Sequence, residues 1–499
     1  MIEMITNINN AINGVVWGWP ALILLGFVGV LMTVLTKFFQ LGHFKHWMVN
    51  TIGAIFSDKH VTKHTEDQSI SQFQSLCTAL AATVGTGNIV GVAGAIAVGG
   101  PGAVFWMWLI AFFGMMTNYS ENVLGILYRR KNEKGQWNGG AMYYLRDGLG
   151  GKPGCKTIGA VLAVLFSCFC LLASFGIGNM SQVNSMVANI HTAFGIPNLA
   201  TGIFLLVIVG LVVVGGIKRI ATITEKIVPF MVIVYLVGTL VIIVMHVGAI
   251  PAVFVSIFKG AFALKSAAGG IVGSGIALAM KMGMKRGVFS NEAGLGSSVM
   301  VHSSSNVKEP VRQGMCGIFE VFADTIVVCT LTAMTILSSG AIDLETGLMT
   351  AEAEAVGSSS LMSYAFSQVF GRPGAWFIAI AILLFAYSTV LGWSHYGSIA
   401  CEYLFGAKAV NVYRVIFVIL VLSGSVLEAQ LAWDISDTFN GLMMIPNLIG
   451  VLVLSPLVMK CTQNYVDRKF HHKDIEPMLS MFPEIQAEQA AAMAKDGDD

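Results

Sequence analysis

Long apolar runs alternate with short polar loops along most of this chain. A helix needs about 20 predominantly apolar residues to cross a bilayer, and eleven runs reach or approach that length. The pattern therefore predicts an all-α polytopic membrane protein with eleven transmembrane helices. The predicted spans cover residues 17–38, 71–97, 103–128, 157–190, 197–216, 224–247, 268–300, 312–339, 373–404, 410–429 and 437–458.

Glycines interrupt two of these spans. The second span contains Gly85-Thr-Gly-Asn, and the seventh contains Gly-Gly-Ile-Val-Gly-Ser-Gly, which ends at Gly275. A helix that breaks at bilayer depth exposes backbone polar groups, which is tolerated only where the break lines a cavity or a site. Two such discontinuous segments in corresponding halves of a chain point to the binding site of a secondary transporter.

The ten spans after the first divide into five plus five, and each group opens with a broken helix. Because five is odd, the two groups have opposite orientations in the membrane. We therefore expect a first repeat over residues 71–247 and a second, inverted repeat over 268–458. An N-terminal outside segment with an extra helix would occupy residues 1–40. A cytoplasmic tail over 459–499 would end in a frayed polar stretch.

Half-helix N-termini at such breaks can hold a carboxylate, and unwound carbonyls can hold a cation. That chemistry suits a zwitterionic amino acid bound together with sodium. The alternative is that these glycines only allow helices to pack closely.

Composition agrees with a membrane protein, and the distribution of charge indicates its orientation. Of 499 residues, 55% are hydrophobic and 11% are charged, and the net charge of +1 gives no sign of a nucleic-acid partner. With the N-terminus outside, few of the 29 Lys and Arg fall in outside loops, namely Lys259, Lys265 and Arg372. The positive-inside rule therefore predicts a cytoplasmic C-terminus. The basic inner loops favour a bacterial inner membrane, and the oligomeric state is left open.

The chain shows no Walker loop and no long soluble domain, so we do not expect an enzyme. A membrane nutrient sensor without transport is an alternative, although such a protein needs a signalling domain.

Four segments resemble one transporter family. They are Gly99-Gly-Pro-Gly-Ala-Val-Phe-Trp-Met-Trp-Leu-Ile-Ala-Phe-Phe-Gly, Gly85-Thr-Gly-Asn-Ile-Val-Gly, Asn138-Gly-Gly-Ala-Met-Tyr-Tyr-Leu and Phe289-Ser-Asn-Glu-Ala-Gly-Leu-Gly-Ser. The family is that of the alanine/glycine:cation symporters, also called the sodium:alanine symporters. The resemblance implies a fold of the neurotransmitter-sodium-symporter (LeuT-like) type, preceded by one extra helix. It also implies uptake of alanine or glycine driven by co-transported sodium.

The candidate substrate residues lie in the broken spans and in the fourth and ninth spans. Asn179 and Gln182 are three residues apart, which places them on one helical face. The resemblance implies that the side-chain amides of the fourth span bind the substrate. It also implies that free backbone N–H groups at the first break bind the substrate carboxylate, and that Trp393 limits the size of the substrate side chain. The alternatives are interhelical hydrogen bonds for the amides and simple packing for Trp393. The full candidate set is Thr86, Gly87, Asn179, Gln182, Gly273, Gly275, Thr389 and Trp393.

The candidate sodium ligands are oxygens, which hard cations prefer. By resemblance to the fold, carbonyls of the first break would be joined by hydroxyls of the ninth span. The alternatives are that Asn88 caps the helix after the break and that the hydroxyls bond back to their own helix. The predicted set is Ala81, Val84, Asn88, Ser388 and Thr389.

Asp324 lies well inside the eighth span, and an intramembrane acid is a functional hypothesis by default. It is a possible coupling acid that compensates a bound cation or carries a proton. If Asp324 or His395 carries a proton, the chain would be a proton-coupled amino-acid transporter of the same fold. The alternative for Asp324 is a structural pair with a basic or polar partner. For Glu292, in the fourth family-like segment, we expect a pair with Lys285 or Arg286.

Overall fold

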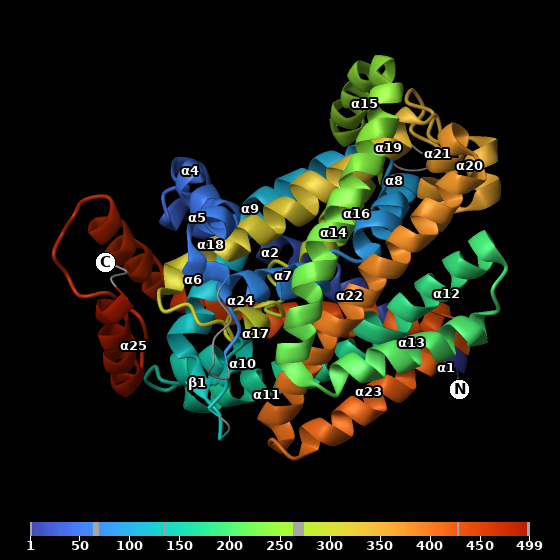
Figure 1. Ribbon diagram of the computed structural model, residues 1–499. Helices are drawn as coiled ribbons and strands as arrows, with labels where there is room; N and C mark the ends of the chain where they lie inside the picture. Colours follow the sequence, from blue (N-terminus) through green and yellow to red (C-terminus); the bar gives the residue numbers. More distant parts are fainter. Residues whose placement is uncertain (1, 63–68, 134, 263–273, 427–428, 497–499) are drawn as a thin grey trace.

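The computed structural model describes residues 2–62, 69–133, 135–262, 274–426 and 429–496, and most of these residues are helical. Within these ranges, eight helices are long and apolar enough to cross a membrane, and up to nine when a bent pair is taken as one span. The protein is therefore a multi-pass, predominantly helical membrane protein. The N-terminus and the C-terminal helix lie at opposite sides of the view in Figure 1.

The first half of the chain begins with a helical pair and leads through several short helices to the long spans. Its helices are α1 (Ile2–Val16), α2 (Trp19–Leu35), α3 (Phe39–Gly42), α4 (Phe44–Met48), η1 (Val49–Gly53), α5 (Ala54–Ser57), α6 (Lys59–Thr62), α7 (Gln72–Thr83), η2 (Gly87–Gly91), α8 (Val92–Gly99), α9 (Gly102–Tyr128), α10 (Ala141–Tyr143), η3 (Tyr144–Leu149), α11 (Lys156–Phe175), η4 (Gly176–Met180), α12 (Ser181–Phe194), α13 (Asn198–Val213) and α14 (Gly216–Met245).

A two-stranded antiparallel sheet follows α9, in which β1 (Arg130–Lys131) pairs with β2 (Trp137–Asn138). The remaining helices are η5 (Val247–Ala249), α15 (Ile250–Phe262), α16 (Ser274–Asn291), α17 (Val299–His302), α18 (Pro310–Val321), η6 (Phe322–Cys329), α19 (Thr330–Ser338), α20 (Ala351–Val356), η7 (Ser358–Ser360), α21 (Leu361–Phe370), α22 (Arg372–Phe405), α23 (Ala409–Val426), α24 (Ala429–Lys469) and α25 (Pro483–Asp496).

Each predicted span overlaps helix in the described residues, but the number and ends of the spans differ from the prediction. The first apolar helix starts at Glu3, because α1 precedes α2 where we expected an outside segment. The fifth predicted span corresponds to α13, which has only 16 residues. The seventh begins in residues outside the described ranges. The count of eleven therefore stays a prediction.

Helix α9 packs against α16 and α18, and it lies beside α18 in Figure 1. Small residues bring these helices together. A side chain at Gly317 of α18 would meet the Asn122 amide nitrogen at 2.4 Å, and a side chain at Gly287 of α16 would meet Ile110 of α9 at 3.0 Å. Such close approach at small residues is typical of helix packing in membranes.

The tail differs from the frayed end that we expected. Helix α24 continues to Lys469, so residues 459–469 are helical. Beyond it, the segment that includes α25 packs back on the C-terminal end of α9: Met481 donates its backbone N–H to the Leu127 carbonyl at 2.9 Å, and Lys131, just after α9, pairs with Glu488 at 2.6 Å. The side chain of Met493 is buried. Tertiary contacts, which composition alone does not reveal, therefore order this segment.

Candidate functional site

The first glycine break is present and bends the span. Helix α7 begins with a capping box in which Ser71 and Gln74 exchange side-chain to backbone hydrogen bonds of 3.1 Å, and it ends at Thr83. The second half, Gly87–Gly99, is inclined by 48° to the first. Asn88 closes the turn between the halves, because its side-chain oxygen accepts the Gly85 N–H at 2.9 Å. The break therefore has a defined geometry in the buried interior.

Gln182 of α12 binds the break directly. Its side-chain oxygen accepts a hydrogen bond from the Thr86 hydroxyl at 2.9 Å and lies 3.4 Å from the Thr86 backbone nitrogen. Both side chains are buried. A buried amide needs such partners, and here they belong to the backbone turn that we expected to face the substrate carboxylate. Two of the predicted substrate residues are thus in contact.

Thr389 of α22 lies against the same turn, next to Gly85. Its hydroxyl is 3.0 Å from the Ala81 carbonyl and 3.0 Å from the Phe385 carbonyl of its own helix. The neighbouring hydroxyl, that of Ser388, bonds back to Phe385 at 2.8 Å and lies 3.6 Å from the Met231 sulfur. The structure therefore joins Ala81 and Thr389, two predicted sodium ligands, whereas Ser388 bonds mainly within α22.

Asp324 has polar partners rather than a basic one. Asn88 donates its amide to one carboxylate oxygen at 2.6 Å, Ser290 donates its hydroxyl to the same oxygen at 3.2 Å, and Thr325 donates to the other at 2.8 Å. Asp324 lies in η6, a π-helical stretch, and such stretches are frequent at functional sites. The acid is thereby linked through Asn88 to the turn at Gly85.

Helix α16 meets the same site with its C-terminal end. Most of the predicted second break, residues 269–275, lies outside the described residues, Gly273 included, so that break stays a prediction. Gly275 is described and lies in the first turn of a continuous helix, about 22 Å from Ser290 at 1.5 Å per residue. A second interruption, which approaches the first break, follows Asn291. There Gly87 lies beside Ser290, with 3.4 Å between the Ser290 Cα and the position of a Gly87 Cβ.

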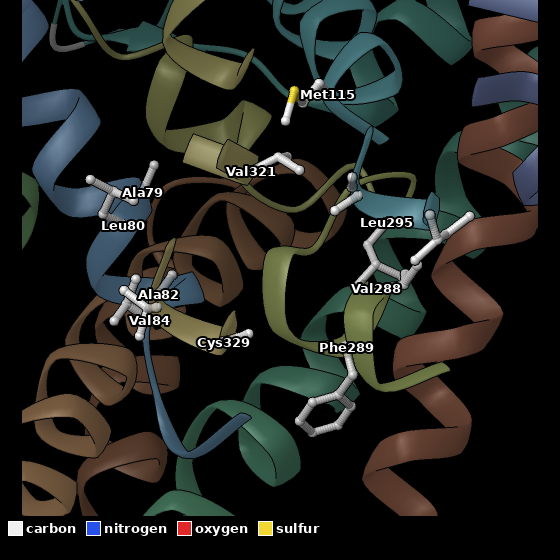
Figure 2. Packing of buried hydrophobic residues seen from close by; sticks show 14 of the residues in the cluster. Ala79, Leu80, Ala82, Val84, Met115, Val288, Phe289, Leu295, Val321 and Cys329 are labelled. Carbon is white, nitrogen blue, oxygen red and sulfur yellow. The ribbon is translucent and has the colours of Figure 1, made fainter. Parts of the chain in front are cut away.

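This second interruption occupies the family-like segment Asn-Glu-Ala-Gly-Leu-Gly-Ser. Its turns need left-handed backbone, with φ of 56° at Glu292, 94° at Gly294 and 73° at Gly296. The two closely spaced glycines are the sequence signal that indicates this turn. Figure 2 shows the apolar side chains around this region, with Val84 at the end of α7, Cys329 from η6 and Phe289 from α16.

Trp393 is held by Glu292, a site residue for which we expected a basic partner. The indole N–H donates to the Glu292 carboxylate at 2.9 Å, and the Ser297 hydroxyl donates to the other carboxylate oxygen. Lys285 pairs instead with Asp437 at 2.5 Å. Trp393 also packs tightly on Gly178, where an added Cβ would lie 2.4 Å from the tryptophan Cβ. The large ring is therefore fixed in position.

Asn179 does not join Gln182 at the break. Its amide donates to the Phe417 carbonyl of α23 at 2.6 Å. The reason is the π-helical turn η4, Gly176–Met180, which changes the angular step between the two residues. A spacing of three no longer places two side chains on one face across such a turn. In this structure Asn179 links two helices, which was the alternative interpretation.

The site contains two carboxylates, Asp324 and Glu292, several hydroxyl and carbonyl oxygens, and a broken helix. The oxygens can hold a cation, and the turn at Thr86 can hold an anion.

Comparisons with known proteins give a consistent family. The sodium:alanine symporter family matches residues 2–479. The sodium/alanine symporter AgcS of Methanococcus maripaludis is 42% identical over 458 residues, which is 91% of this chain and 96% of that one. The probable sodium/glutamine symporter GlnT of Bacillus subtilis is 36% identical, covering 95% of this chain and 93% of its own.

Solved structures share the fold at low sequence identity. A sodium-coupled sialic acid symporter in a substrate-bound outward-open state aligns with a TM-score of 0.52 and 12% identity, covering 95% of this chain and 97% of its own. MhsT in complex with L-phenylalanine aligns with a TM-score of 0.51 and 13% identity, covering 80% of this chain and 99% of its own. The likeness shows a LeuT-like transporter fold. By its full-length match, the chain belongs to the sodium:alanine symporter family, whose members are membrane transporters and not enzymes.

Proposed function

We propose that this protein is a sodium-coupled symporter that imports a small neutral amino acid, alanine or glycine, by alternating access. The observation that carries the proposal is the junction of α7 and α22, where the Thr389 hydroxyl meets the Ala81 carbonyl beside the turn that Gln182 binds. A cation at this junction would tie the broken helix to α22. The amino acid would bind next to it, with its carboxylate at the Thr86–Gly87 turn.

The small size of the proposed substrate is supported by the walls of the site. Gly85 leaves no room for a side chain beside Thr389, and Trp393 is fixed by Gly178 and Glu292. The membrane potential would add drive, because each co-transported charge is worth about 2.3 kcal/mol per 100 mV. We further propose inverted repeats over residues 71–247 and 268–458, an outside N-terminus and a cytoplasmic C-terminus in a bacterial inner membrane.

Uptake of labelled L-alanine into proteoliposomes tests the proposal. We expect uptake with an inward sodium gradient, none with an equal potassium gradient, and competition by glycine. Uptake that follows an imposed pH gradient and ignores sodium would overturn sodium coupling and favour proton transfer through Asp324. No uptake with alanine, glycine, serine or glutamine under either gradient would contradict transport of small neutral amino acids and favour a sensor.

Removal of the Thr389 hydroxyl tests the sodium ligand. We expect Thr389→Val to raise the sodium concentration for half-maximal uptake about tenfold, since an interaction of a hydroxyl with a charge contributes about 1.5 kcal/mol or more. Thr389→Ser, which keeps the hydroxyl, should stay near the wild type. Ser388→Ala is the matched control, because Ser388 bonds to its own helix. An equal shift in that control would argue against a specific role for Thr389.

Replacement of Trp393 tests the size limit. We expect Trp393→Leu to lower about tenfold the glutamine concentration that half-inhibits uptake of labelled alanine. The smaller side chain leaves space for a larger substrate where the indole ring was held in place. Trp376→Leu is the control, since the Trp376 side chain is 43% exposed at the surface. If glutamine competes no better while alanine uptake persists, the tryptophan does not set substrate size.

A further inference from the structure

A cavity of about 840 Å³ lies between the C-terminal ends of α2 and α24, away from the transport site. Much of its wall is apolar, with Leu35, Phe39, Met459, Phe470 and Met478 among the lining residues. Two lysines also line it, Lys37 directly after α2 and Lys460 in α24. The cavity therefore combines an apolar surface with positive charge.

The sequence places this cavity at the level where the membrane ends. Helix α2 is apolar up to Leu35 and is followed almost at once by Lys37. Helix α24 likewise changes from apolar to charged at Lys460. Large apolar side chains are exposed beside the cavity, with Phe38 44%, Leu41 58% and Met459 42% accessible. Exposed apolar residues next to lysines are typical of the boundary between acyl chains and headgroups.

The positive charge of the cavity is not neutralised by the protein. Lys37 and Lys460 are exposed, and neither has an ion-pair partner among the described residues. The lining acid, Asp467, is already paired with Lys473 at 3.1 Å and bonded by Gln463 at 3.0 Å. Two uncompensated cations therefore remain at the cavity.

The position of Lys37 depends on an unusual turn. Lys37 and Phe38 both have left-handed backbone, with φ of 57° and 56°. The turn is fixed by a hydrogen bond from the Phe38 N–H to the Thr33 carbonyl at 2.8 Å. Left-handed backbone disfavours residues with a Cβ by roughly 1–2 kcal/mol each. The chain nevertheless has a lysine and a phenylalanine there, so that a cation and an apolar ring stand side by side at the boundary.

We propose that this cavity binds one anionic glycerophospholipid, with the phosphate on Lys37 and Lys460 and an acyl chain along the apolar wall. Basic pockets between spans on the cytoplasmic side are suited to anionic headgroups. A free phosphate would leave the apolar wall unoccupied. A zwitterionic lipid would add the positive charge of its own headgroup to those of the two unpaired lysines, so we expect it to bind more weakly.

Native mass spectrometry of the purified full-length protein, titrated with phosphatidylglycerol or phosphatidylcholine, tests this proposal. We expect the wild type to bind phosphatidylglycerol about thirtyfold more tightly than phosphatidylcholine, the factor that two lysines supply at about 1 kcal/mol each. The double variant Lys37→Gln/Lys460→Gln should weaken phosphatidylglycerol binding about thirtyfold and leave phosphatidylcholine unchanged, at about 1 kcal/mol per lysine. Lys152→Gln/Lys156→Gln removes the same charge from exposed positions outside the cavity and should leave both affinities unchanged.

A second variant examines the apolar wall. Met459→Gln should weaken both lipids by a similar factor, because it makes the acyl surface polar without changing charge. Thermal unfolding curves confirm that each variant is folded. Equal affinities of the wild type for the two lipids would overturn the proposal, as would an equal loss in the control pair. Displacement of phosphatidylglycerol by millimolar inorganic phosphate would show an anion site and also overturn the proposal for a lipid.

Discussion

Replacing Gly85 with alanine is expected to reduce amino-acid uptake about hundredfold or more in a protein that still folds. An added Cβ would lie 2.3 Å from the Thr389 hydroxyl, 3.3 Å from the Thr389 Cβ and 3.5 Å from the Gln182 side-chain oxygen. Because contacts as short as the first are not sustained, α7 and α22 would have to separate at the proposed sodium and carboxylate positions. A displacement of about 1 Å at a reacting or binding centre is enough for such a loss.

Initial rates of sodium-driven alanine uptake measure this effect, with melting temperature as the test of folding. Overpacking itself should destabilise the protein by about 1–3 kcal/mol. The matched control is Gly91→Ala, in the second half of the same broken span, where an added Cβ meets nothing within 4 Å. Wild-type uptake by Gly85→Ala, or an equal loss in Gly91→Ala, would show that this contact does not position the site.

Asn88→Asp is also expected to cause a severe loss of uptake, and a second substitution, Asp324→Asn, is expected to restore most of it. The Asn88 amide lies 2.6 Å from the Asp324 carboxylate, so the variant would bring two carboxylates together in a buried site. A buried, uncompensated charge costs about 3–5 kcal/mol, which corresponds to at least about a hundredfold loss of uptake. The hydrogen bond from the Gly85 N–H can persist, since aspartate still offers an oxygen.

The exchanged pair Asn88→Asp/Asp324→Asn should recover uptake to within about tenfold of the wild type, because donor and acceptor have only changed places. Asn189→Asp serves as the control, since its amide bonds to the Ser185 carbonyl of its own helix. Failure of the exchange to recover any uptake would mean that the acid is needed at position 324 itself. That outcome favours a coupling role for Asp324 over a purely structural one.

The first break could be predicted from the sequence because Gly85 and Gly87 flank a threonine in the middle of an apolar run, where an unbroken helix would be expected. The contact of Thr389 with Ala81 followed from resemblance to a known fold, not from spacing. The predicted break at residues 269–275 lies largely outside the described residues and stays a prediction. The interruption after Asn291 was not predicted, because its first left-handed residue is Glu292, a residue type that does not indicate such a backbone.

Three of the π-helical segments, η2, η4 and η6, explain why sequence periodicity did not predict which side chains meet at the site. A π turn shifts the face on which later residues lie, so Asn179 and Gln182 diverge despite a helical spacing. The partners of Asp324 likewise come from η2 and α16, far away in sequence. Such contacts depend on how helices are placed in space, and local pattern carries no information about them.

The packing of the C-terminal segment on α9 bears on how the chain is assembled during synthesis. The Leu127 carbonyl accepts a hydrogen bond from Ser480, a residue made 353 positions later. Until that residue leaves the ribosome, the C-terminal end of α9 lacks this contact, and Lys131 lacks the carboxylate of Glu488. Closure of this end is therefore one of the late events of biogenesis, and nascent chains stalled before residue 480 should be more open to proteases there than the finished protein.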